Sequence, residues 1–455
     1  MGQILILSNF TKAFRYLKKN GLGAAFSAVE ERILQERSQA EEAGGNGTGS
    51  RYQPPTETEL DAQRRRSWPE PVLFSIAVPA YETDPVYLKE LLDSLQEQTY
   101  PCWELILADA GTGDSVRKAA EARADERIRY IRLASNDGIA GNTNAAIELA
   151  QGAYIGLLDH DDILTRDALY EMACALEKQE QNGIHPVFLY SDEDKCDGEA
   201  QNTYEPHRKM DFNLDLLLSN NYICHFLVMD AAVMKRLRLR TGFDGAQDYD
   251  LVLRAAGQVL EGTPEEAYVH IPKILYHWRC HRNSTASNPA SKNYAYEAGR
   301  RALEDFGREH GWKVQAEDTR HLGFYRLEFM PDALSQRSDL GAVAGPLPSR
   351  NGRLVSGIYD ESPDSTVTMR YDGLKRRFSG YMHRAVLTQD VEAADIRTMQ
   401  VRPEFRKDLD LALQEIRAGA DPVRTSIAFC LTLRKRGFRI LWDPDRKEGN
   451  QRKQP

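Results

Sequence analysis

Three carboxylates and an imidazole follow directly after an apolar run of strand length. Residues 153–158 form the run, and Asp159, His160, Asp161 and Asp162 come next. Carboxylate oxygens in this position suit a hard divalent cation, which in turn holds phosphate oxygens. Acids make up 68 of the 455 residues, so the cluster alone also fits an ordinary solvated turn. The neighbouring elements must decide between a metal site and a turn.

Polar residues also follow the other expected strands of this region. In an open α/β sheet the ligand binds beyond the carboxyl ends of the strands, so a site is expected there. These ends carry Pro79, Ala80, Tyr81 and Glu82 after the first strand, Asp109 on the second, residues 136–144 after the third and residues 191–195 after the fifth. Five polar, mostly acidic ends in succession favour a ligand site over a series of solvated loops.

The elements that must position these residues alternate between strand and helix. Strands are expected at residues 72–78, 103–108, 128–133, 153–158 and 187–190, with amphipathic helices between them. This alternation predicts an α/β protein with a mostly parallel sheet flanked by helices. Beyond residue 200 the pattern loosens, with a strand-like run at 223–229 and helical runs at 247–256 and 287–310.

Composition and missing motifs exclude several classes of protein. A net charge of -9 argues against a nucleic-acid partner, and no apolar run is long enough to span a bilayer. The six cysteines form no Cys-x-x-Cys pair, which argues against a zinc ribbon and fits a reducing, cytoplasmic location. A dinucleotide-binding domain would need Gly-x-Gly-x-x-Gly where residues 79–82 stand, and a P-loop motif is absent as well.

Changes in composition divide the chain into four expected parts. Residues 1–40 are expected to form a helical extension, 41–70 a flexible linker, 71–320 the main α/β domain and 321–455 a smaller α/β region. In the extension, apolar side chains from Phe10 to Leu17 share one helical face, and basic side chains from Lys12 to Lys19 lie opposite. Such a helix either contacts a membrane surface peripherally or packs on protein.

Several of these residues, in their order along the chain, resemble the motifs of a known family. Residues 78–82, Asp109, Asn144, residues 158–162, residues 245–251 and residues 274–279 are similar to family 2 inverting glycosyltransferases with the glycosyltransferase-A fold. The resemblance runs from about residue 72 to residue 290. From about residue 340 the chain resembles the later half of a second such module, without its Pro-x-Tyr and Asp-x-Asp motifs. One active site is therefore expected, with a truncated or degenerate second module in the C-terminal region.

The resemblance assigns a role to each motif. It implies that Pro79, Ala80, Tyr81, Glu82 and Asp109 cradle the nucleotide base, that Asn144, Asp159 and Asp192 also bind the nucleotide sugar, and that Asp161 binds Mg²⁺ or Mn²⁺. It implies that Asp248 is the catalytic base, with Asp250 as the alternative base. Asp248 also fits a purely structural role, as an acid that caps or stabilises the first turn of a helix. Gln247 stands where many members of the family carry Glu.

Two residues near the end of the resembling region have less specific signals. His277 is expected either to complete the metal site or to be a packed histidine. Arg279 is expected to oppose the charge of the phosphates. Asp192, named above, also fits a surface ion pair.

These expectations combine into one function and two rivals. The expected enzyme moves a sugar, hexosyl or deoxyhexosyl, from a UDP- or dTDP-sugar to a hydroxyl of a growing cell-surface glycan, free or lipid-linked. A divalent cation neutralises the leaving diphosphate, and a carboxylate takes the proton of the hydroxyl. The rivals are a nucleotidyltransferase and a non-catalytic, carbohydrate-binding relative that acts as a scaffold.

Overall fold

The computed structural model describes residues 29–31, 52–280, 293–375 and 378–446, and the chain in it forms two compact units. The larger unit comprises Gly47–Phe212 and Asn221–Ala302, and the smaller unit comprises Met1–Asn46, Asn213–Asn220 and Leu303–Pro455. The smaller unit takes up the chain again at Leu303, and the expected domain boundary at residue 320 stays a prediction. The expected helical extension is described only at residues 29–31, which are helical, so its membrane face lies outside the described residues.

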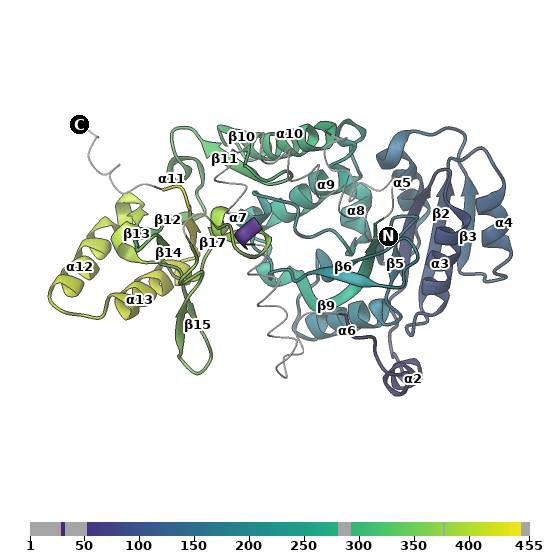
Figure 1. Ribbon diagram of the computed structural model, residues 1–455, viewed down its shortest axis with the longest axis horizontal. Helices are drawn as coiled ribbons and strands as arrows, with labels where there is room; N and C mark the ends of the chain where they lie inside the picture. Colours follow the sequence, from purple (N-terminus) through teal and green to yellow (C-terminus); the bar gives the residue numbers. More distant parts are fainter. Residues whose placement is uncertain (1–28, 32–51, 281–292, 376–377, 447–455) are drawn as a thin grey trace. The chain divides into compact units, whose positions relative to one another are not determined.

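A nine-stranded mixed sheet forms the larger unit (Figure 1). Its path is β3-β2-β1-β4-β8-β6-β9-β5, and β7 pairs with β6. The strands are β1 (Phe74–Ala80), β2 (Trp103–Asp109), β3 (Ile128–Arg132), β4 (Tyr154–Leu157), β5 (Ile163–Leu164), β6 (Phe188–Cys196), β7 (Thr203–His207), β8 (Leu227–Asp230) and β9 (Tyr268–Arg279). Strands β1 to β4 pair in parallel, as the alternating pattern predicted.

Helices cover this sheet and supply the apolar faces that bury it. They are α3 (Pro85–Gln96), α4 (Ser115–Glu121), α5 (Gly138–Leu149), α6 (Ala168–Gln181), α8 (Ala231–Leu237) and α9 (Gln247–Ala256). Helix α10 (Asn293–Glu309) crosses the boundary between the two units, which falls after Ala302. Figure 1 shows α3, α4 and α5 around the β1–β3 part of the sheet. Leu88, Leu91 and Leu95 of α3 are fully or almost fully buried in the core cluster that contains β1 and β2. Asp84 caps α3 as expected, since its side chain accepts from Val86 N at 2.8 Å.

Strand β8 runs antiparallel to both of its neighbours, β4 and β6. The first residue of β8, Leu227, pairs with the last residue of β4, Leu157. Because the two strands run in opposite directions, the residues just before β8 lie at the same edge as those just after β4. This places the segment 221–226 beside the acidic cluster.

Two expectations about irregular segments are wrong. Part of the expected linker is helix α2 (Glu57–Arg65), because Thr56 and Glu59 form a capping box and Leu60 is fully buried. The acids expected in a loop after residue 190 lie inside β6, which continues to Cys196. They remain in the strand because each has a basic partner: Asp192 contacts His270, Glu193 contacts Lys209, and Asp194 contacts His277.

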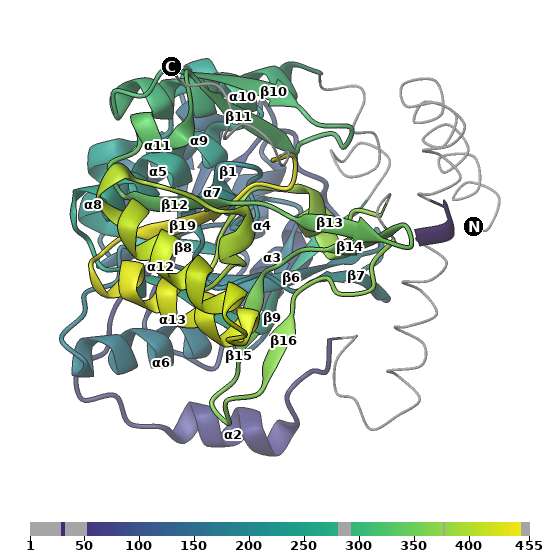
Figure 2. The same ribbon diagram turned by 90° about the vertical axis from the view of Figure 1, so that its left-hand side faces the viewer.

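The smaller unit is also α/β, as expected for the C-terminal region. Its four-stranded sheet has the order β17-β19-β12-β18, from Gln389–Asp390, Arg439–Trp442, Leu340–Ala344 and Gln400–Val401. Helices α12 (Arg406–Arg417) and α13 (Pro422–Lys435) pack together, as Figure 2 shows in yellow. Short elements complete the unit: α7 (Leu214–Leu217), α11 (Ala333–Gln336), β10 (Val314–Asp318), β11 (Tyr325–Phe329), β13 (Leu347–Arg350), β14 (Arg353–Val355), β15 (Tyr359–Glu361) and β16 (Val367–Met369). No helix among the described residues combines the length and apolarity that a bilayer span requires.

Candidate active site

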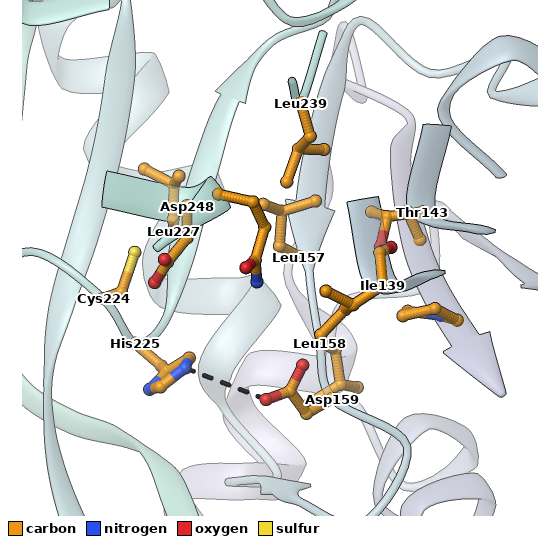
Figure 3. Close-up of a pocket in the computed structure, with 13 residues that line it drawn as sticks. Ile139, Thr143, Leu157, Leu158, Asp159, Cys224, His225, Leu227, Leu239 and Asp248 are labelled. Carbon is orange, nitrogen blue, oxygen red and sulfur yellow. Dashed lines mark hydrogen bonds and ion pairs between the residues drawn. The ribbon is translucent and has the colours of Figure 1, made fainter. Parts of the chain in front are cut away.

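A pocket opens at the carboxyl ends of β1 and β4 (Figure 3). It lies wholly within the larger unit. Its lining comes from six places in the chain: β1 with Ala77 and Pro79, α5 with Ile139 and Thr143, the end of β4 with Leu157, Leu158 and Asp159, the start of β8 and the segment before it with Cys224, His225 and Leu227, the loop residue Leu239, and α9 with Gln247 and Asp248. The pocket therefore joins the predicted acidic cluster to the predicted base, which are 89 residues apart in sequence.

Asp159 faces His225 across the lower part of this pocket. The distance from His225 Nε2 to Asp159 Oδ2 is 3.9 Å, and the Asp159 side chain is 42% exposed. The His225 ring stacks on Tyr276 with a centroid separation of 5.0 Å. Burial lowers the pKa of His225, but Glu193, Asp159 and Asp162 outweigh it and raise the pKa to about 9. The imidazole is therefore a cationic neighbour of Asp159 at neutral pH.

The other two acids of the cluster have different environments. Asp162 is 1% exposed, and its carboxylate accepts from Arg279 N at 2.7 Å and from the Tyr276 hydroxyl. Asp162 therefore ties the acidic turn to β9. Asp161 is half-buried, and its carbonyl oxygen accepts from Arg279 Nε at 2.6 Å. The backbone of the turn is thus held from below by strand β9.

Arg279 is fully buried and does not line the pocket. Besides the Asp161 carbonyl, its guanidinium donates to Gly198 O at 2.9 Å and forms an ion pair with Glu90 at 2.6 Å. The guanidinium also lies over the Tyr87 ring, 4.5 Å from its centroid. These contacts make Arg279 a support of the acidic turn, whereas the sequence predicted a direct contact with phosphate.

Asp248 lines the pocket from the first turn of α9. Its Oδ1 accepts from Tyr249 N at 2.8 Å, and its Oδ2 accepts from Asn221 Nδ2 at 3.1 Å. The alternative base, Asp250, is 1% exposed and is bonded by Arg240 and Arg254, so it has a structural role. Of the two candidates, only Asp248 is placed to accept a proton from a molecule in the pocket.

Cys224 lies beside Asp248 in the pocket wall. Burial raises the pKa of its thiol well above the usual value, and the charge of Asp248 raises it further. A protonated thiol is a poor nucleophile, so the pocket does not favour a covalent intermediate on cysteine. Gln247, next to the base, accepts from Gly245 N at 2.7 Å through its side-chain oxygen.

The residues expected to bind the nucleobase lie around the loop after β2. Asp109 is fully buried; it accepts from Gly111 N at 2.8 Å and from the Tyr130 hydroxyl at 2.9 Å. Glu82 accepts from Thr112 N at 3.1 Å, and Tyr81 is 50% exposed. A side chain at Gly111 would bring a Cβ within 2.9 Å of Asp109 Oδ1, so this tight loop requires glycine. Ala80 is buried in the core, whereas Pro79 lines the pocket.

Of the predicted site residues, Pro79, Asp159 and Asp248 line the pocket, and the others lie outside its lining, including Asp161 and the three described next. Asn144 donates to Leu239 O at 2.7 Å and accepts from Leu239 N at 3.0 Å, which supports a pocket residue indirectly. Asp192 is 1% exposed within β6, where it accepts from Lys209 N at 2.8 Å and from His270. His277 contacts Asp194 and the ring of Tyr52, on the opposite face of β9 from Tyr276. Their assigned roles stay predictions.

The donor set for a divalent cation consists of two carboxylates. Within the described residues, no group of three or more His, Cys, Asp and Glu side chains has the geometry of a metal site. Mg²⁺ commonly uses one or two carboxylates and takes its other ligands from phosphates and water, so Asp159 and Asp161 fit this type of site. Burial raises the pKa of Asp159, the charge of His225 lowers it, and the charges of Asp161 and Asp248 raise it. A bound cation would add to the compensation that His225 provides.

The sequence of the larger unit matches a known family. Residues 75–241 match the model described as glycosyl transferase family 2. This region is a family 2 glycosyltransferase domain. The predicted family and the glycosyltransferase-A fold are thereby confirmed, with Asp159 inside the matched region and Asp248 just beyond it.

Two relatives of this glycosyltransferase domain are much longer proteins than this chain. An uncharacterized protein, y4gI, from Sinorhizobium fredii is 41% identical over 239 residues, which are 51% of this chain and 25% of y4gI. The O-antigen biosynthesis protein RfbC from Myxococcus xanthus is 35% identical over 239 residues, 51% of this chain and 18% of RfbC. The chain thus aligns with a quarter or less of either relative. The crystal structure of S. aureus TarS 1–349 in complex with UDP-GlcNAc has a TM-score of 0.41 at 17% identity, over 52% of this chain and 66% of that chain.

Sequence reasoning missed the part of the pocket wall that precedes β8. Asn221, Cys224 and His225 precede β8, and their position at the site depends on β8 being antiparallel to β4. The register of that pair, continued two residues past Leu157 and Leu227, sets His225 opposite Asp159. An alternating strand–helix pattern predicts parallel neighbours, so the available signal was the loss of that alternation after residue 200.

Proposed function

We propose that this domain transfers a sugar from a nucleoside diphosphate donor to a hydroxyl group, with inversion at the anomeric carbon. The observation that supports it best is the pocket that joins Asp159 of the acidic turn to Asp248 of α9. Donor binding and proton removal require two such groups on facing walls of one cavity.

Each group has a defined part in a single displacement. The acceptor oxygen attacks the anomeric carbon, the bond from that carbon to the phosphate oxygen breaks, and Asp248 takes the proton of the hydroxyl. Asp159 and Asp161 would hold Mg²⁺ or Mn²⁺, which supplies Lewis-acid neutralisation of the leaving diphosphate when bound. Tyr81, exposed at the end of β1, offers a flat surface for the nucleobase.

The acceptor that we propose is a growing cell-surface polysaccharide. Support comes from RfbC, a relative named for O-antigen biosynthesis. A single displacement with inversion forms no covalent intermediate on the protein, so the reaction needs a base for the acceptor hydroxyl rather than a nucleophilic side chain. The protonated state of Cys224 agrees with this choice.

A donor panel tests the proposal directly. Purified protein is incubated with UDP-GlcNAc, UDP-glucose, dTDP-rhamnose or GDP-mannose in MnCl₂ or in EDTA, and release of the nucleoside diphosphate is measured with and without added polysaccharide. We expect one donor to be turned over only with the metal. Asp161→Ala is expected to abolish metal-dependent binding of that donor, and Asp248→Asn to lower kcat by about 10²- to 10⁴-fold with donor binding retained.

Two results would contradict this function. One is failure of all four donors to bind or react, which would favour a non-catalytic carbohydrate-binding protein. The other is turnover that survives both substitutions. Release of pyrophosphate from a nucleoside triphosphate and a sugar phosphate would instead favour the nucleotidyltransferase.

A further inference from the structure

Asn221 reaches the proposed base from a separate segment of the chain. It begins the run 221–226 that leads into β8 and supplies Cys224 and His225 to the pocket. Its Nδ2 donates to Asp248 Oδ2 at 3.1 Å. We propose that Asn221 is a positioning residue for Asp248, an inference that rests on the proposed glycosyl transfer.

The position of Asp248 in its helix explains why a second group is needed. It lies in the first turn of α9, where a carboxylate commonly turns back to bond the unpaired backbone N–H groups. Here the N-cap residue Ala246 provides no side-chain hydrogen bond, and Asp248 Oδ1 already accepts from Tyr249 N. The bond from Asn221 fixes the other oxygen from outside the helix. The carboxyl plane is then set by two donors, and each oxygen keeps a lone pair for the acceptor proton.

An amide suits this position better than other side chains. A lysine would hold the base in an ion pair and weaken it, and a carboxylate would repel it. A neutral donor orients Asp248 without adding charge to a pocket that already contains Asp159 and His225. The choice has a cost, because Asn221 Oδ1 is buried and has no hydrogen-bond partner among the described residues. An unpaired buried carbonyl destabilises the fold, so packing alone would favour an apolar residue here.

The chain offers a matched control for the test. Asn202 also donates its Nδ2 to an aspartate, Asp197 Oδ2, at 2.8 Å, but on an exposed turn outside the pocket lining. The variants are Asn221→Leu, Asn221→Asp and Asn202→Leu, each in the full chain. The assay measures nucleoside diphosphate release with whichever of the four donors the wild type turns over, in MnCl₂. Thermal unfolding confirms that each variant folds.

The expected result is a separation of kcat from KM. Asn221→Leu and Asn221→Asp should lower kcat by about 10- to 100-fold, which corresponds to the loss of one hydrogen bond to a charged group, and should leave the donor KM within about twofold. Asn202→Leu should match the wild type. In the Asp248→Asn background, Asn221→Leu should cause little further loss, because its effect passes through the base.

The outcomes separate this inference from the function beneath it. If the wild type turns over no donor, the proposed function fails. If the wild type is active and Asp248→Asn is not, but both Asn221 variants keep kcat, Asn221 does not position the base. A kcat loss that adds in full to that of Asp248→Asn would also overturn the inference, and so would failure of both Asn221 variants to fold while Asn202→Leu folds.

Discussion

Replacement of Arg279 by methionine distinguishes the role expected from the sequence from the role that the contacts indicate. Arg279 is fully buried, donates to the carbonyl oxygens of Asp161 and Gly198, and pairs with Glu90. A methionine keeps the apolar part of the arginine stem but provides none of these donors. The carbonyl oxygen of Asp161 would lose its side-chain donor and Glu90 its counter-charge, whereas the bonds from Arg279 N and Tyr276 to Asp162 would remain.

The size of the effect follows from these contacts. Removal of one partner of a buried ion pair costs about 3–5 kcal/mol. Glu90 is 29% exposed and regains some hydration, so the lower part of this range, about 3 kcal/mol, is expected. Arg64→Met is the control, since Arg64 pairs with Asp61 on the exposed surface of α2, with side chains 38% and 58% exposed. Its loss should change the free energy of unfolding by less than about 1 kcal/mol.

Two measurements decide between the roles. Urea unfolding followed by circular dichroism gives the free energy of unfolding, and calorimetric titration gives the affinity for UDP in MnCl₂. A supporting residue lowers stability, and Arg279→Lys, which keeps one donor, recovers part of it. If Arg279→Met unfolds within 1 kcal/mol of the wild type while UDP affinity falls strongly, the reasoning is refuted and the direct phosphate contact expected from the sequence is correct.

Three further changes have defined outcomes. His225→Phe keeps the aromatic stack but removes the ring nitrogen that faces Asp159, so the Kd for UDP with Mn²⁺ should rise about tenfold by calorimetry; an unchanged Kd would contradict the contact. His383 has its pKa lowered to about 4 by burial and by Arg320, so its neutral form stabilises the smaller unit. That stability should be lost as the pH falls from about 6.5 towards 4, and His383→Gln should flatten this part of a stability–pH curve. Gly152→Ala would place a Cβ 2.4 Å from a backbone oxygen and should destabilise by about 1–3 kcal/mol in urea unfolding, whereas Gly242→Ala, with no atom within 4 Å, should be close to neutral.

Sequence patterns predicted correctly those features that neighbouring residues determine. The strands up to β4 and the acidic turn after β4 were predictable because each follows from a short apolar run and the residues that end it. The base at Asp248 came from a motif that resembles a family, not from periodicity. The strands and the turn could be predicted because residues adjacent in sequence determine them.

The rest depended on partners that are distant in sequence. Strand β6 continues through Asp192 because His270, 78 residues later, pairs with it, and no local pattern announces that partner. The sequence suggested that Arg279 opposes the charge of the phosphates, and no local pattern indicates that it is buried and paired with Glu90; its predicted role stays a prediction. In both cases tertiary pairing overrides the preference of the isolated residue.

The smaller unit provides an internal comparison that bears on the number of active sites. In it β12 pairs in parallel with β19 and antiparallel with β18, and α12 and α13 lie between β18 and β19. The larger unit has the same arrangement in β6, β9 and β8, with α9 between β8 and β9. This shared topology supports the prediction of a truncated second module.

The chemistry of the two helices differs where it matters. The first turn of α9 carries Asp248 and Asp250, whereas the first turn of α13 carries no acid. Within α13, Ser426 Oγ accepts from Ile396 N at 3.2 Å. A hydroxyl, not a carboxylate, therefore joins α13 to the segment before β18. A hydroxyl with its ordinary high pKa cannot serve as the base for a sugar hydroxyl. The first turn of α13 therefore carries no carboxylate that could act as such a base, and one active site, with Asp248 as its base, stays the prediction.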